Sequence, residues 1–298
     1  MRVMMLLKSD AQSEAGVMPD TKALTDMGKY CETMVNAGVM LGGEGLHASS
    51  KGAKLRIVNS RTTVLDGPFA EAKEVVAGYF LLNVKSLAEA IEWVKKIPCP
   101  DDIEGEGLIE LRPLYEAEDF PISPEEQAGG WRDQEIEARS SWKAAGPEKG
   151  LRWISFIKAD KNTEAEMKAN EKLLQEMGGL IGEMMAKEIM ISGDGLRATK
   201  HGARVFVSKK SARVVDGPFA EAKELIAGFT VYRAKTKAEA IEWARRCLQI
   251  HIDGTGIDAG EIEVRQVHEA EDIPVAADEV AGGWRERDKK LRAQLNQV

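Results

Sequence analysis

Two identical segments of nine residues carry the side chains with the clearest chemical potential. The segment Asp-Gly-Pro-Phe-Ala-Glu-Ala-Lys-Glu spans residues 66–74 and recurs at residues 216–224. The candidate catalytic residues are its carboxylates, Asp66, Asp216, Glu71 and Glu221. A carboxylate held against apolar walls has a raised pKa and can transfer protons near neutral pH. The structural alternative is that each aspartate stabilises a turn, because Asp before Gly-Pro accepts backbone hydrogen bonds.

The same two regions contain the candidate ligand-binding residues. These are Arg112, Arg265, Lys73, Lys223, Gly78, Gly228, Phe69 and Phe219. Each arginine lies on the polar face of an expected strand, and a guanidinium that faces the interior needs an anion, either a neighbouring carboxylate such as Glu110 or a carboxylate ligand. The Glu and Lys residues of the motif are also typical of a solvated face. A glycine within a strand indicates either close backbone approach or space for a pocket.

The two motifs belong to a long internal repeat. An offset of 150 residues also aligns the Gly-Leu pair at residues 45–46 with residues 195–196, and the Ala-Glu-Ala-Ile-Glu-Trp segment at residues 88–93 with residues 238–243. After a three-residue insertion, Glu-Ala-Glu-Asp at residues 116–119 matches residues 269–272. Two long copies indicate a domain duplication and not a solenoid.

The repeat also serves as a filter, because a site that both copies share requires the same residue in each copy. All four histidines fail this test: His47, His201, His251 and His268 align with Arg197, Lys51, Asp101 and Tyr115. The three cysteines fail it as well, lack a CxxC pattern and are expected to be free thiols. We therefore expect no shared histidine or cysteine chemistry, no metal site and no cofactor.

Each copy shows the pattern of an α+β unit. In the first copy, strands are expected at residues 3–7, 39–41, 75–84 and 109–114, with a hairpin at residues 55–58 and 63–65. An amphipathic helix covers residues 24–35, and the capping box Ser86-Leu87-Ala88-Glu89 begins another.

The predicted order is βαβββαβ, with both helices on one face of an antiparallel sheet. The strand at residues 75–84 is apolar on both faces, so its second face needs a cover. The sheet of the other copy can supply it, either as two sheets face to face or as one barrel.

Several motifs together resemble the DGPF-type proteins of the YciI-related family. They are Gly-Gly-Glu-Gly-Leu at residues 42–46, the nine-residue motif, Ala-Ile-Glu-Trp at residues 90–93 and Glu-Leu-Arg-Pro at residues 110–113. The likeness covers about 115 residues of each copy. It implies two ferredoxin-like βαβββαβ units that pair as an intramolecular dimeric α+β barrel, in a bacterial, cytoplasmic protein.

The resemblance leaves function largely open. An acidic residue in a cleft implies an enzymatic role in that family, and gene neighbours that encode extracytoplasmic-function sigma factors imply a regulatory one. Some relatives use a His–Asp pair, for which this sequence shows no clear histidine, so we expect none here.

Composition narrows the partners. The chain has 298 residues, 43% hydrophobic and 30% charged, with a net charge of −8. We therefore expect a globular protein with no nucleic-acid and no membrane partner. The apolar stretch at residues 1–7 is short for a signal peptide, so we expect none, and the free cysteines favour a cytoplasmic location. The composition is compatible with either a monomer or a homo-oligomer.

The domain boundaries follow from the repeat. We expect a first domain at residues 1–120, a tail and linker at 121–150, a second domain at 151–274 and a C-terminal tail helix at 275–298. Three functional hypotheses remain. One is a small-molecule site near Asp66 or Asp216 with isomerase- or lyase-like acid–base chemistry. The second is a regulatory or protein-interaction module that uses Trp131 and Trp284 of the tails, and the third is a purely structural motif.

Overall fold

The computed structural model describes residues 1–71, 75–99, 106–116, 119, 146–167, 171–219, 225–269, 272 and 290. In the first half, the strands are β1 (Arg2–Lys8), β2 (Met40–Gly45), β3 (Ala53–Val58), β4 (Arg61–Asp66), β5 (Val76–Asn83) and β6 (Gly107–Pro113). Its helices are α1 (Ala11–Glu14), α2 (Thr21–Asn36) and α3 (Leu87–Val94), with a 3-10 turn η1 (Ser49–Lys51). These six strands fall on the six predicted ranges, so the order βαβββαβ is wrong in counting only five.

The second half repeats these elements. Its strands are β7 (Leu151–Lys158), β8 (Met190–Gly195), β9 (Ala203–Val207), β10 (Ala212–Asp216), β11 (Ile226–Ala234) and β12 (Ala259–Gln266). Its helices are α6 (Lys161–Glu164), α7 (Glu171–Ala186) and α8 (Lys237–Thr255), with the turns η4 (Pro147–Lys149) and η5 (Thr199–His201). No described helix is both long and apolar enough to cross a membrane.

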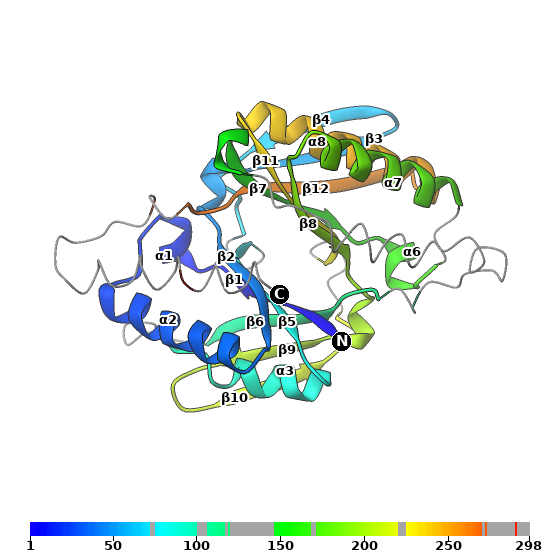
Figure 1. The fold of residues 1–298 in the computed structure, drawn as a ribbon. Coiled ribbons are helices and arrows are strands. Elements are labelled where there is room, and N and C mark those ends of the chain that lie inside the picture. The colour runs from blue at the N-terminus through cyan, green and yellow to red at the C-terminus, as the bar shows by residue number, and fades with distance from the viewer. Residues whose placement is uncertain are drawn as a thin grey trace.

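The halves exchange a hairpin. One sheet has the order β10-β9-β6-β1-β5-β2 and the other β4-β3-β12-β7-β11-β8, so each hairpin extends the sheet of the opposite half (Figure 1). Without the hairpins, each half is an antiparallel βαββαβ ferredoxin-like unit. The hairpin is an insertion of two strands into this unit.

The inserted strand β3 has one apolar face. Ala53, Leu55 and Ile57 are buried and alternate with polar residues, as expected for a strand with one face in a core. Leu55 lies opposite Ile262 of β12, in the core of the second half. Val205 and Val207 of β9 complete the core of the first half in the same way.

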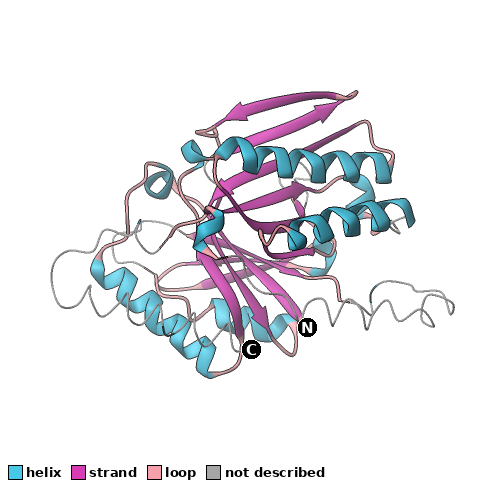
Figure 2. Ribbon diagram, turned by 45° about the horizontal axis from the view of Figure 1, so that its top comes forward, coloured by secondary structure: helices cyan, strands magenta, loops and turns pink. Residues whose placement is uncertain are grey.

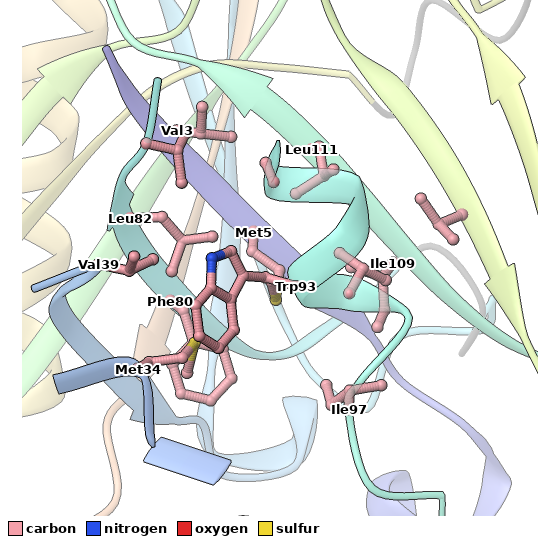
Figure 3. Packing of buried hydrophobic residues seen from close by; sticks show 14 of the residues in the cluster. Val3, Met5, Met34, Val39, Phe80, Leu82, Trp93, Ile97, Ile109 and Leu111 are labelled. Carbon is pink, nitrogen blue, oxygen red and sulfur yellow. The ribbon is translucent and has the colours of Figure 1, made fainter. Parts of the chain in front are cut away.

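Three cores stack through the molecule. Figure 1 shows α7 and α8 above one sheet and α2 and α3 below the other, and Figure 2 shows strands between these helices as well as a pair of strands at the outer edge. The core beneath α2 and α3 contains Met34, Phe80 and Trp93 (Figure 3). A second core lies beneath α7 and α8. The third lies between the sheets and contains Met4, Phe156 and Phe229.

The two sheets also meet at their corners. Backbone bridges join Leu46 to Val267 and Leu114 to Leu196. The strand β5 contributes Phe80 and Leu82 to the helix side and Val76 and Tyr79 to the space between the sheets. The structure therefore confirms that β5 is covered on both faces and that the two halves form an intramolecular α+β barrel.

Candidate functional site

The two motif aspartates lie at the outer edges of the two sheets. Asp66 ends β4 and Asp216 ends β10, and both are exposed. The side chain of Asp66 is 72% exposed, and one of its oxygens lies 2.6 Å from Lys237 Nζ. Glu71 is also exposed. The two aspartates lie on different sheets, and the structure does not bring them together.

The rest of the motif packs against the turn η1. The Phe69 N–H donates to Ser49 Oγ at 2.9 Å. A Cβ on Gly67 would lie 1.9 Å from the Ser49 carbonyl oxygen, so only glycine fits there. The second copy repeats this contact, with the Phe219 N–H and Thr199 Oγ1 at 3.3 Å. The motif thus holds the turn that follows residue 47 or residue 197.

The predicted arginines hold the other side of these turns. Arg265 is fully buried, and its Nη2 donates to the His47 carbonyl oxygen at 2.5 Å. Arg112 is also fully buried and donates to the Arg197 carbonyl oxygen at 2.6 Å. The anions beside the guanidinium groups are Glu263 at 3.1 Å and Glu110 at 3.2 Å. The structure therefore gives each arginine a carboxylate on its own strand.

Glu110 and Glu263 remain ionised in this buried setting. Burial raises the pKa of Glu263, but Lys158, Arg265 and Lys54 outweigh it and lower that pKa to about 2. The pKa of Glu110 is likewise below its usual range, because Lys8, Arg112 and Arg204 outweigh burial. Two matched buried charge networks thus support the two turns.

The remaining predicted residues have packing roles where they are described. A Cβ on Gly78 would lie 2.9 Å from the Glu44 carbonyl oxygen, and one on Gly228 3.1 Å from that of Asp194. Both glycines therefore permit close approach of the neighbouring strand. Phe69 and Phe219 are buried beneath Lys54 and Arg204. Lys73, Lys223, Glu221, Trp131 and Trp284 lie outside the described residues.

The first turn carries a histidine pair that the sequence did not reveal. His47 Nε2 lies 2.9 Å from Asp272 Oδ2, so the expectation of no His–Asp pair is wrong. The His47 and His268 rings have centroids 3.8 Å apart, and Lys51 Nζ lies 3.3 Å from His47 Nδ1. We call His47, Lys51, His268 and Asp272 the histidine site.

The pKa values of this site define its charge. Burial lowers the pKa of His47, with Lys51 and Arg265 contributing, although the bond to Asp272 opposes them. Burial, followed by the proximity of His47, lowers the pKa of His268 to about 4. Burial raises the pKa of Asp272, but hydrogen bonds from the Glu269 N–H and His47 outweigh it and leave the pKa lowered.

Both imidazoles are therefore neutral at pH 7 and Asp272 is ionised. An ammonium can only donate, so His47 Nδ1 accepts from Lys51 and the Nε2–H donates to Asp272. Asp272 thus fixes the tautomer of His47, which is the role of the carboxylate in a catalytic His–carboxylate pair.

Among the described residues, His47, His268 and Asp272 form a group that could hold a metal ion. One donor atom each from His47, His268 and Asp272 lies within 4.8 Å of the others. A metal ion held by His47 Nε2 and Asp272 would replace the hydrogen bond between them and would lie near the Lys51 ammonium. This positive charge opposes a second cation at the site.

The second turn carries a different set, which we call the arginine site: Arg197, His201, Lys200, Glu166, Tyr115 and Asp119. Glu166 lies 2.6 Å from Lys200 Nζ, 3.0 Å from His201 Nε2 and 3.5 Å from Arg197 Nε. Arg197 Nη1 also lies 3.4 Å from Asp119. Burial raises the pKa of Glu166, but the Lys200 and His201 hydrogen bonds outweigh it and lower that pKa to about 2.

The repeat filter failed at the histidine site because the site combines both copies. His47 comes from the first copy and His268 from the second, and each aligns with a different residue type. A comparison of like positions cannot detect a pair whose members occupy unlike positions. The one signal in the sequence was the Glu-Ala-Glu-Asp segment at residues 269–272, which follows His268 directly.

A separate surface depression of about 240 Å³ lies by α2 and is lined in part by Tyr30, Trp93 and Lys96. It contains none of the candidate residues.

Comparisons with known proteins agree with the duplication. A protein of Rhizobium meliloti (strain 1021), described as uncharacterized, is 32% identical over 95 residues, which cover 32% of this chain and 75% of that protein. A crystal structure of an anthrone oxidase-like protein covers 92% of this chain and 95% of its own, at 12% identity and a TM-score of 0.34, which is too low to carry an argument. The model of the YCII-related domain matches twice, at residues 1–118 and 155–271, so the chain belongs to the YCII-related family as a tandem duplication.

Proposed function

We propose that the protein binds a small molecule at the histidine site and acts on it by proton transfer at His47. The observation that carries this proposal is the bond of 2.9 Å between His47 Nε2 and the ionised Asp272. Because Asp272 holds the Nε2–H, Nδ1 is the basic atom of the ring. Nδ1 faces the ammonium of Lys51, an exposed and flexible side chain that a substrate can displace.

Proton abstraction at Nδ1 converts His47 to an imidazolium, which Asp272 stabilises across the ring. Lys51 then lies close enough to stabilise negative charge that develops on the substrate. If the proton returns to a different atom of the substrate, the reaction is an isomerisation. If the substrate instead loses a neighbouring group, the reaction is that of a lyase. The Asp-Gly-Pro-Phe motif contributes by holding the turn that sets the position of His47 and Lys51.

The test measures how fast deuterium from the solvent replaces protons in a panel of small carbonyl compounds. In D2O, the wild-type protein is expected to accelerate exchange of the proton next to the carbonyl group in at least one class, as seen by proton NMR. His47→Gln and Asp272→Asn should remove the acceleration, whereas His201→Gln at the arginine site should retain it. Exchange at the rate of buffer, or exchange unaffected by His47→Gln, would contradict the proposal.

A further inference from the structure

The arginine site contains a carboxylate that the histidine site lacks. Glu166 follows α6 with its backbone at φ 52°, and the residue at the same place in the first half is Gly16, at φ 75°. Their backbones are equivalent, because the Glu166 N–H donates to the Thr163 carbonyl and the Gly16 N–H to that of Ser13, both at 3.1 Å. The only change at this position is therefore the side chain.

The neighbours of the Glu166 carboxylate identify what would surround the same place in the first half. Glu166 contacts Arg197, Lys200 and His201. The corresponding residues of the first half are His47, Ser50 and Lys51. A Cβ built on Gly16 would meet no atom within 4 Å, so the place is open.

The cation beside this open place has no carboxylate in direct contact among the described residues. Among the described residues, Lys51 contacts no carboxylate, and its ammonium lies against His47. Its counterpart His201 contacts Glu166. Ser50 and Lys51 are both exposed, so a molecule from solvent can reach them.

We infer that the histidine site takes a small carboxylate, which occupies the place that the Glu166 side chain takes at the arginine site. The carboxylate draws the Lys51 ammonium away from His47 and so exposes Nδ1. This inference rests on the proposed function and adds the chemical class of the substrate. The contacts of Glu166 with Lys200 and His201 show how a carboxylate can be held by this turn.

The test is a proton NMR titration of the full chain with sodium acetate, at constant ionic strength, against sodium chloride and inorganic phosphate. The signal of the His47 ring, assigned with His47→Gln, should shift and saturate with acetate and move little with chloride or phosphate. Gly16→Glu should reproduce the acetate-bound position without acetate and remove further response. The matched variant Gly16→Gln has the same size without charge and should leave the ring at its acetate-free position.

The reciprocal variant is Glu166→Gly, which should give His201 a saturable response to acetate that the wild type lacks, whereas Glu166→Gln should not. No saturable response of His47 in the wild type, equal responses to all three anions, or acetate binding retained in Gly16→Glu would each overturn the inference. The deuterium-exchange assay described above tests the proposed function separately from the binding of a carboxylate. Exchange into a neutral carbonyl compound that depends on His47 would leave the acid–base site standing without the carboxylate.

Discussion

The histidine site and the arginine site share a backbone and a supporting structure but differ in charge. Beneath each turn lies a buried arginine that binds the carbonyl group of the first site residue, Arg265 for His47 and Arg112 for Arg197. Above the turn, Glu166 neutralises the cations of the arginine site, whereas Gly16 leaves Lys51 with no such carboxylate. The comparison shows that equivalent backbones can carry different charges, since Glu166 contacts Lys200 and His201 while Lys51 contacts His47.

The largest effect should come from the shared support. Arg112→Met and Arg265→Met each leave a buried glutamate with one partner fewer, and each should lower the free energy of unfolding by about 3 kcal/mol. Urea unfolding at pH 7 measures this, with Arg245→Met on the exposed face of α8 as the control. Clearly unequal losses would show that the two supports are not equivalent.

The next effect is a pH dependence of stability that comes from His268 of the histidine site, where the arginine site has Tyr115. His268 has a pKa of about 4 in the folded protein, below its value in the unfolded chain, so the unfolded state binds the extra proton first. Stability should fall as pH drops from about 6.5 to 4, by about 2 kcal/mol after allowance for the partial exposure of the ring. His268→Tyr, which copies Tyr115, should flatten this part of the curve. A wild-type curve that coincides with that of His268→Tyr would contradict the assignment.

A smaller loss should follow removal of the internal carboxylate. The pKa of Glu166 is about 2 in the folded protein, so its contribution is complete above its unfolded pKa and is lost as pH falls toward 2. Glu166→Gln should cost about 1 kcal/mol at pH 7 and progressively less below pH 4.5. Glu176→Gln, on the surface of α7, is the control. A cost that does not change with pH would point to packing as its cause.

The smallest change in stability should come from Asp272→Asn, within about 0.5 kcal/mol because the side chain is partly exposed. Its effect should appear instead in the titration of His47 by NMR. Loss of the carboxylate that stabilises the imidazolium should lower the pKa of His47 further. Asp119→Asn at the arginine site should leave the titration of His47 unchanged, and an unchanged titration in Asp272→Asn would mean that the pair does not couple.

Much of the scaffold followed from residue patterns. The helix that begins after Ser86 has the predicted cap, since the Ser86 side chain accepts from the Glu89 N–H at 3.2 Å. The carboxylate on the same strand as Arg112 was also foreseeable, because alternate residues of a strand share a face. Such features depend on neighbours in the sequence.

The exchange of hairpins and the histidine site did not follow, for a common physical reason. The alternation of Ala53, Leu55 and Ile57 predicts a buried face but does not state which sheet it joins. His47 and His268 come from different halves and meet beside the backbone bridge between Leu46 and Val267. Contacts between residues more than 200 positions apart leave no periodic signal in a single sequence.

The exchanged hairpins have an evolutionary consequence. Two identical chains that traded these hairpins would build two identical sites, and any mutation would alter both at once. With both halves encoded in one chain, a substitution such as glycine or glutamate at the position shared by Gly16 and Glu166 is made once and inherited separately. The duplication thus releases the protein from symmetry, so that two equivalent turns can carry different side chains, as Gly16 and Glu166 do.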